Sequence, residues 1–162
     1  MKRTSLSIKD LNKLLQEHNL QIQFSKQDQA QIAEEKDAKY TKVILINNQP
    51  SFFYYPINNK EIIIPTLKLL QTNPALLKHI TIDMGAIKFI IGGADIMRPG
   101  ITHIDDNIHP SQPLLICDQT HKKPLAIGIS LHSSEELRTL TSGKVIKNIH
   151  YVGDELWKLE IK

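Results

Sequence analysis

Hydrophobic and polar positions near the start of the chain follow the period of a helix. The first apolar residues recur at intervals of three and four: Ile8, Leu11, Leu14 and Leu15. This spacing places them on one face of an amphipathic helix. Ser7 precedes the run and Asp10 follows three residues later, which is a capping-box arrangement. We expect the helix to end at Asn19.

The pattern then changes to that of short strands. Residues 26–38 are highly polar with few apolar anchors, and they predict a weak surface helix or a loop. Residues 42–46 are rich in β-branched side chains and predict a strand, with residues 51–55 returning after a turn as its hairpin partner. A further strand is expected over residues 61–64.

A short helix and a break follow these strands. Pro65 fits the first position of a helix, because its missing N–H costs little there. We expect this helix to end at Asn73-Pro74. The break divides the chain into a small α/β domain, residues 1–77, and a second domain, residues 78–162. No Gly/Ser-rich linker separates them, so we expect the two to pack rigidly.

The second half consists of short apolar runs between turns. These runs cover residues 113–117, 125–129, 144–146 and 156–161. Residues 119–123 join the first two runs as a hairpin loop, and Ser133 opens a capping box for a short helix that ends near Ser142-Gly143. Several short strands at this spacing predict a small barrel or sandwich.

The segment from Ile82 to Ile101 predicts a capped short helix, a glycine exit and a tight turn. Asp83 is expected to cap the helix, and Gly92 and Gly93 to supply the positive φ that ends it. Arg98-Pro99-Gly100 suits a turn. Three of its apolar residues are expected in the core: Ile87, Ile90 and Ile91. The small residues predict a surface where backbone approaches a partner closely.

Three patches, residues 64–70, 83–100 and 148–157, resemble the PUA domain, an RNA-binding module. The likeness is greatest to the malignant-T-cell-amplified-sequence family of translation factors, including stand-alone archaeal relatives. The resemblance implies an α+β protein. Its N-terminal α/β pre-PUA domain is followed by a small C-terminal PUA β-barrel with short helices.

The resemblance also implies a site. In PUA domains this helix and the loop after it line the RNA surface. That role falls on five positions of this chain: Gly85, Ala86, Lys88, Gly93 and Ala94. The turn formed by Arg98, Pro99 and Gly100 joins the predicted site, because an arginine in a rigid turn suits recognition of a phosphate or a base edge. For Arg98 the alternative is a surface arginine paired with Asp95. The chain departs from its relatives at Ser111-Gln112-Pro113, where Gly-Asp often leads into the next strand.

The resemblance implies partners too: the small ribosomal subunit and the acceptor end of tRNA, in initiation, re-initiation or recycling. A protein-interaction adaptor in a translation or RNA-modification complex is the alternative, because eukaryotic relatives act with a partner protein. The chain's first half, with its basic excess and the aromatic strand at residues 52–55, would then carry the contact.

Charge modifies this picture only slightly. Net charge is +3 over 162 residues. Residues 1–77 hold ten Lys/Arg against seven Asp/Glu, and residues 78–162 hold ten against ten. A neutral second half exerts little long-range attraction on nucleic acid, so we expect a contact directed by shape.

Composition predicts the compartment. Cys117 is the only cysteine, which favours a reducing compartment and a role as a small buried hydrophobe. No apolar run approaches the roughly 18 residues that a membrane span needs. We therefore expect a cytoplasmic protein with no membrane contact.

One motif points to different chemistry. His103, Asp105, Asp106 and His109 bring two imidazoles and two carboxylates into seven residues, a set that suits a divalent metal or a metal-dependent hydrolase. Since no second ligand set accompanies them, we favour a polar surface loop and expect no metal or other cofactor.

Catalysis and base stacking find little support elsewhere. The chain has no nucleophile elbow and no phosphate-binding glycine loop, so we expect a non-catalytic protein. Trp157, the only tryptophan, is expected in the core or at an interdomain seam.

Overall fold

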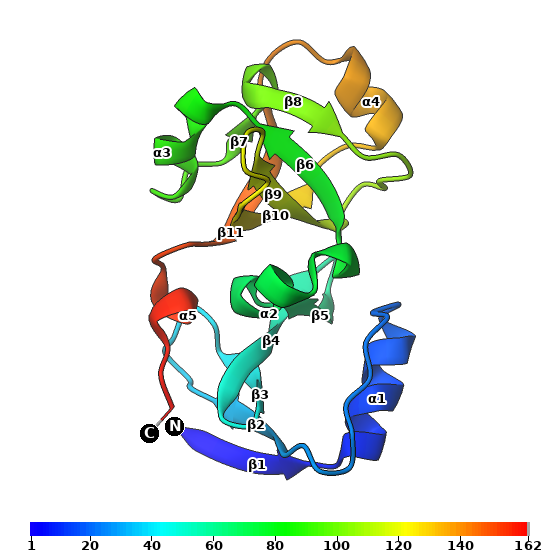
Figure 1. Ribbon diagram of the computed structural model, residues 1–162, viewed down its shortest axis with the longest axis vertical. Coiled ribbons are helices and arrows are strands. Elements are labelled where there is room, and N and C mark those ends of the chain that lie inside the picture. Colours follow the sequence, from blue (N-terminus) through cyan, green and yellow to red (C-terminus); the bar gives the residue numbers. More distant parts are fainter. Residues whose placement is uncertain (162) are drawn as a thin grey trace.

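The computed structural model describes residues 1–161, so residue 162 of the predicted second domain lies outside the described residues. Two sheets stack along the long axis of the molecule (Figure 1). The first is an antiparallel sheet of five strands in sequence order: β1 (Lys2–Leu6), β2 (Ala30–Glu34), β3 (Lys42–Ile46), β4 (Gln49–Ile57) and β5 (Lys60–Pro65).

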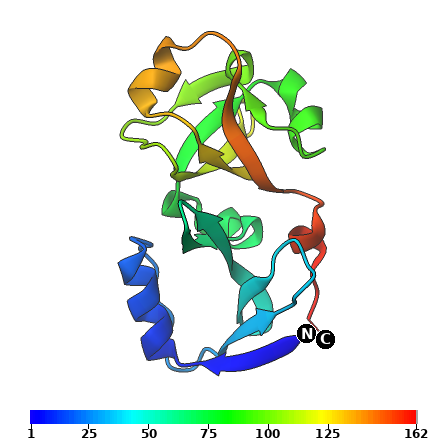
Figure 2. The same ribbon diagram turned by 180° about the vertical axis from the view of Figure 1, so that it is seen from behind.

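The second sheet has six strands in the order β7-β11-β10-β9-β6-β8. Their bounds are β6 (Lys78–Ile82), β7 (Ile96–Met97), β8 (Ile101–Ile104), β9 (Pro113–Asp118), β10 (Pro124–Ser130) and β11 (Lys144–Tyr151). The β6–β9 pair is parallel and the other pairs are antiparallel. The sheet curls into a half-barrel (Figures 1 and 2). The α+β class and the small C-terminal barrel with short helices are thus confirmed.

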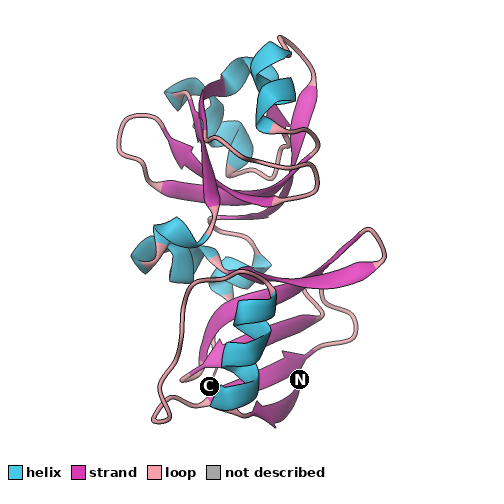
Figure 3. Cartoon of the chain, turned by 90° about the vertical axis from the view of Figure 1, so that its right-hand side faces the viewer, coloured by secondary structure: helices cyan, strands magenta, loops and turns pink. Residues whose placement is uncertain are grey.

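Helix α1 (Ile8–Glu17) covers one face of the first sheet (Figure 3). The Ser7 hydroxyl accepts a hydrogen bond from the Asp10 N–H at 3.1 Å, and Asn19 takes a left-handed φ of 57° after the helix. Leu11 and Leu15 are fully buried against the sheet. The predicted helix and its cap are confirmed. They could be predicted because the residues that specify them lie close together in the sequence.

Two expectations for the first half are wrong. Residues 30–34 form strand β2 where a surface helix or loop was expected, because Ala30 and Ala33 are buried between β1 and β3. Pro65 ends β5 instead of opening a helix. The cap of α2 (Leu67–Thr72) is Thr66, whose hydroxyl accepts from the Leu69 N–H at 3.3 Å.

In the second half, the apolar runs at residues 113–117, 125–129 and 144–146 are strands, as predicted. Helix α4 (Ser134–Thr139) begins with the predicted capping box at Ser133. The strand expected over residues 156–161 is wrong. Asp154 accepts a hydrogen bond from the Trp157 N–H at 2.9 Å and caps a short helix, α5 (Glu155–Lys158).

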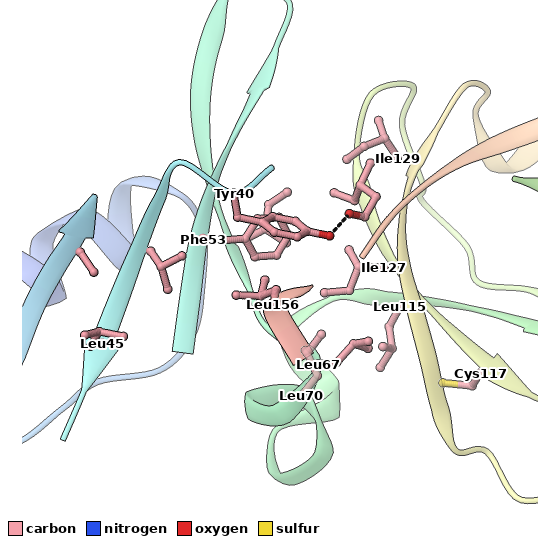
Figure 4. Close-up of a cluster of buried hydrophobic side chains, with 14 residues drawn as sticks. Tyr40, Leu45, Phe53, Leu67, Leu70, Leu115, Cys117, Ile127, Ile129 and Leu156 are labelled. Carbon is pink, nitrogen blue, oxygen red and sulfur yellow. Dashed lines mark hydrogen bonds between the residues drawn. The ribbon is translucent and has the colours of Figure 1, made fainter. Parts of the chain in front are cut away.

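The two sheets share a hydrophobic core (Figure 4). Tyr40 and Phe53 of the first half face Ile127 and Ile129 of β10. Leu67 and Leu70 of α2, Leu115 of β9 and Leu156 of α5 complete the contact. Trp157 packs partly buried against this core, as expected for a seam residue. One core between the halves agrees with the expectation that they pack rigidly.

A buried polar network crosses the same seam. The Asp154 carboxylate lies 2.6 Å from the Tyr40 hydroxyl and 2.8 Å from His150 Nδ1. The Tyr40 hydroxyl is also 2.7 Å from the Ile149 carbonyl oxygen. The Leu67 N–H donates to His150 Nε2 at 3.2 Å, so the imidazole proton resides on Nδ1 and points to Asp154. The network joins α2, β11 and the loop before β3.

Stability should depend on the ionisation of Asp154. Burial raises the pKa of its carboxyl, but hydrogen bonds from His150, Tyr40 and the Trp157 N–H outweigh burial and lower it to about 2. A depressed folded-state pKa stabilises the protein above the ordinary value of 3.8, and this stabilisation is lost as the pH falls toward 2. We expect about 2 kcal/mol of unfolding free energy to disappear over that interval.

Denaturant unfolding of the wild type and of Asp154→Asn between pH 5 and pH 2 measures this contribution. The interval begins above the ordinary pKa of 3.8 and ends near the folded-state pKa of about 2. The variant should start less stable and lose less stability as the pH falls. Parallel pH profiles for the two proteins would contradict the assignment.

Gly128 makes room for the strand pairing inside the second sheet. A Cβ at this position would lie 2.3 Å from Ile146 Cγ2 and 3.0 Å from the Lys147 carbonyl oxygen. Gly128→Ala should therefore cost about 1–3 kcal/mol of unfolding free energy. Gly85→Ala is the control, since its Cβ would meet only Asp83 Oδ1 at 3.4 Å, and its effect should stay below about 1 kcal/mol. Equal stability of the two variants in denaturant unfolding would contradict the packing argument.

Cys117 is 2% exposed in β9, as expected of a small buried residue. Burial, with the neighbouring charge of Asp118, raises the pKa of its thiol to about 11. Within residues 1–161, no helix is both long enough and apolar enough to cross a membrane.

Candidate nucleic-acid interface

The helix at residues 83–90 begins as predicted from its sequence. Asp83 Oδ1 accepts a hydrogen bond from the Ala86 N–H at 2.9 Å, which confirms the cap. Met84–Ala86 form a 3-10 turn that leads into α3 (Ile87–Ile90). Because this helix is only one turn long, it buries Ile90 fully and Ile87 in part.

Of the two glycines expected to end the helix with a positive φ, only one has it. Gly93 has a φ of +96°, whereas Gly92 does not enter the left-handed region. Gly93 also lies against an aromatic ring, because a Cβ there would be 3.2 Å from Tyr151 Cε1. Gly93 alone thus requires the positive φ, while a Cβ on Gly92 would press on the Lys88 carbonyl oxygen at 3.3 Å.

Strand β11 holds the loop after α3 in place. Asn148 donates its amide Nδ2–H groups to the carbonyl oxygens of Ile90 and Ala94, each at 3.0 Å. The Asn148 N–H in turn donates to Asp95 Oδ1 at 2.9 Å. The Asp95 carboxylate also pairs with Lys144 Nζ at 3.5 Å. These contacts fix the loop as one wall of a groove.

The groove has a volume of about 760 Å³ and lies between α3 and the turn at residues 98–100. Four of the predicted site residues line it: Gly85, Ala86, Ala94 and Gly100. The two sides approach closely, since a Cβ on Gly100 would be 3.5 Å from Ala86 Cβ. Small residues therefore keep the groove open.

Exposed apolar side chains surround this groove. Phe89 is 59% exposed and Met97 is 51% exposed, and both line the groove. Met84 and Ile91, on either side of α3, are 42% and 40% exposed. The expectation that Ile91 is in the core is wrong, because a single helical turn has too few inward positions for every apolar residue of the segment. A cluster of exposed apolar residues of this kind indicates a contact surface.

Basic groups lie at the edge of the groove. Lys88 is exposed, and its Nζ lies 5.1 Å from the centroid of the Phe89 ring. Lys144 lines the groove and pairs with Asp95. An ammonium beside an aromatic face is an arrangement that accommodates a phosphate and a stacked base together.

Arg98 is directed away from this groove. Its Nε–H donates to the carbonyl oxygen of Leu137 in α4, and Nη1 lies 3.4 Å from the Ile101 carbonyl oxygen. The side chain lines a separate depression of about 490 Å³ together with His103 and Arg138. Its suggested partner Asp95 pairs with Lys144 instead. Arg98-Pro99-Gly100 forms a 3-10 turn, in which Pro99 is exposed.

Polar groups of β6, β8 and α4 hold the loop after β8. His103 Nε2 lies 3.0 Å from Asp105 Oδ1, and Asp105 Oδ2 accepts from the His79 N–H at 2.7 Å. Asp106 pairs with Arg138. Across residues 1–161 no group of three or more His, Cys, Asp or Glu side chains is arranged to hold a metal ion. The observed contacts are those of a surface loop.

The sequence did not predict the exposed apolar residues that line the groove. Phe89 and Met97 were not among the predicted site residues, since an apolar residue within a short helix or strand is usually assigned to the core. A signal was present in residues 89–91, three consecutive apolar positions that a one-turn helix cannot bury together.

Comparisons with known proteins identify the two domains. Residues 78–152 match the PUA domain family, and residues 2–73 match a domain of unknown function, DUF1947. The fold is also that of a PUA-domain protein from Aeropyrum pernix K1 solved as a tartrate complex. The TM-score is 0.80 with 23% identity, over 97% of this chain and 89% of that chain.

Three relatives place the whole chain in a family. An uncharacterized protein of Methanocaldococcus jannaschii is 37% identical, over 98% of this chain and 97% of the relative. Translation machinery-associated protein 20 of Schizosaccharomyces pombe is 32% identical, over 79% and 77%. Malignant T-cell-amplified sequence 2 of Homo sapiens is 31% identical, over 75% and 67%. The chain, with its DUF1947 and PUA domains in that order, therefore belongs to the family of the malignant T-cell-amplified sequence proteins.

Proposed function

We propose that this protein binds RNA in translation through the groove beside α3, and that it is not a catalyst. The observation that carries the proposal is the combination of small residues inside the groove with exposed Phe89 and Met97 along its rim. The similarity to Translation machinery-associated protein 20 supports the link to translation.

The groove suits unpaired nucleotides better than a duplex. Sequence-directed RNA recognition targets single-stranded ends and loops, whose bases stack on aromatic side chains. Phe89 supplies such a ring, and the small residues Gly85, Ala86 and Gly100 let a sugar or base approach backbone. Lys88 lies beside Phe89, where it can meet a phosphate, and such a contact sets the position of the RNA and carries no base specificity.

Within this proposal the eight positions divide into two roles. Gly85, Ala86, Ala94 and Gly100 line the groove, and Lys88 lies beside Phe89, which also lines it. The remaining three shape its walls: Gly93, Arg98 and Pro99. Arg98 acts as a positioning residue by tying the 98–100 turn to α4.

We further propose that residues 1–77 and 78–162 act as two domains on one RNA target. The targets that fit the family resemblance are the acceptor end of tRNA and the RNA of the small ribosomal subunit. The 3′ end of tRNA is single-stranded, which is the form of RNA whose bases can stack on an exposed aromatic ring, so we propose it as the ligand of the groove.

A salt-titrated binding comparison tests the function. The three ligands are intact tRNA, tRNA lacking its 3′ CCA, and small ribosomal subunits. We expect binding that weakens as salt rises and that requires either the CCA end or the subunit. No binding to any of the three at low salt would overturn the proposal and favour a protein adaptor, for which the exposed Met84, Phe89, Ile91 and Met97 would be the contact surface.

A further inference from the structure

Lys39, in the loop between β2 and β3 of the first sheet, lies beside the end of the second sheet. Its Nζ is 5.3 Å from the centroid of the Tyr40 ring and 5.5 Å from that of Tyr151, the last residue of β11. Figures 1 and 2 show this loop next to α5 and below the end of β11. A basic side chain of the first half thus reaches the surface of the second.

The loop that carries Lys39 is anchored across the seam. Tyr40 is 8% exposed, and its hydroxyl meets the Ile149 carbonyl oxygen and the Asp154 carboxylate. Since the neighbouring residue is fixed to the second half, the Lys39 backbone has a fixed position relative to β11. Its ammonium is exposed to solvent at the end of a flexible side chain.

Tyr151 connects Lys39 to the candidate groove. One side of its ring contacts Gly93, the left-handed residue of the loop after α3. Ala94, the next residue along the chain, lines the groove. Lys39, Tyr151, Gly93 and Ala94 therefore form a continuous surface that leads from the groove across the seam.

The charge on this surface is available to an anion. Among the ion pairs of residues 1–161, neither Lys39 nor Lys88 has a carboxylate partner. By contrast, Lys144 is paired with Asp95 and Lys42 with Glu61. The two unpaired ammonium groups each lie beside an aromatic ring, Lys39 near Tyr151 and Lys88 near Phe89.

We propose that the RNA contact continues from the groove over Tyr151 to Lys39, where the ammonium binds a backbone phosphate, so that both halves hold one RNA. The inference rests on the proposed function and extends its site onto the first domain. A phosphate contact of this kind fixes the direction in which the strand leaves the groove and adds no base specificity.

Three variants that each remove one positive charge test whether the RNA contact extends to the first half: Lys39→Gln, Lys88→Gln and Lys13→Gln. Lys13 is the matched control, because it is an exposed lysine of the first half on α1, which lies on the side of the molecule away from α5 (Figures 1 and 2). Affinity for intact tRNA and for small ribosomal subunits is measured across a salt series. Far-UV circular dichroism and melting temperature verify that each variant is folded.

We expect Lys39→Gln to bind about threefold to tenfold more weakly, with a salt dependence shallower by about one counterion, while Lys13→Gln behaves as wild type. Wild-type affinity of Lys39→Gln beside a weakened Lys88→Gln would overturn the extension and leave the proposed function intact. Equal weakening by Lys39→Gln and Lys13→Gln would also overturn it, since charge alone would explain the effect. A wild type that binds neither RNA would refute the proposed function itself.

Discussion

Replacing Asp154 with alanine is expected to lower the free energy of unfolding by about 3–5 kcal/mol, because it removes one partner of a buried charged network. The carboxylate accepts hydrogen bonds from the Tyr40 hydroxyl, His150 Nδ1 and the N–H groups of Tyr151 and Trp157. Without it, these donors are buried with too few acceptors, α5 loses its cap, and the seam between the two sheets loses its polar link.

Equilibrium unfolding in denaturant measures this loss, and an exposed carboxylate provides the control. Asp106 pairs with Arg138, but its side chain is 81% exposed. Asp106→Ala should therefore change the unfolding free energy by less than about 1 kcal/mol. If Asp154→Ala were as mild as Asp106→Ala, the network would not be the main polar link of the seam.

Replacing Phe89 with alanine is expected to weaken RNA binding by about 1–3 kcal/mol, which is the value of one base stacked on an aromatic side chain. This corresponds to a loss of roughly fivefold to more than a hundredfold in affinity. The side chain is 59% exposed, so its removal should leave the unfolding free energy almost unchanged. A large effect on binding without an effect on stability distinguishes a contact residue from a core residue.

Leu131→Ala is the matched control for Phe89→Ala. Leu131 is another exposed apolar residue of the second half, 42% exposed, and it does not line the groove. Its removal should leave RNA affinity at the wild-type level. Equal affinities of the wild type, Phe89→Ala and Leu131→Ala would contradict stacking on Phe89.

The fold elements that could be predicted are those whose signals are local. The Ser7 cap of α1, the Asp83 cap before α3 and the Ser133 capping box each depend on residues within one helical turn. The hairpin of β9 and β10 is similar, because Asp118 accepts hydrogen bonds from N–H groups of the turn that joins them.

The elements that were missed depend on distant partners. Strands β1 and β2 are polar by composition and form because each pairs with a neighbour, Lys2 opposite Glu34 and Glu34 opposite Lys42. Helix α5 was mistaken for a strand, since the alternation of Trp157, Leu159 and Ile161 concealed the Asp154 cap. Leu156 is buried and Trp157 partly buried in the core that the two sheets share, which a reading of residues 156–161 alone does not reveal.

The sequence predicted the small residues of the candidate site but not the direction or exposure of its larger side chains. The small residues that line the groove carry a conformational signal, and the structure brings Gly85, Ala86, Ala94 and Gly100 together. The direction of Arg98 is set by the carbonyl oxygen of Leu137, a residue far along the chain, so its sequence neighbours could not specify it. The exposure of Phe89 and Met97 likewise depends on how much of α3 the half-barrel covers.

The shared core gives the two domains a common role in this account. Tyr40, Phe53 and α2 pack on β9 and β10, so the first sheet has a fixed orientation relative to the groove. A fixed orientation is what allows Lys39 and Phe89 to act on one RNA molecule, because a flexible joint would separate the two contacts.

The central claim is that the groove beside α3 is the RNA-binding face, and cross-linking tests it most directly. The wild-type protein is irradiated with ultraviolet light while bound to intact tRNA or to small ribosomal subunits, and the cross-linked peptides are identified by mass spectrometry. The account predicts cross-links in residues 84–97, with Phe89 foremost. Cross-links confined to other surfaces, such as the depression beside Arg98 and Arg138, with none in residues 84–97, would contradict it.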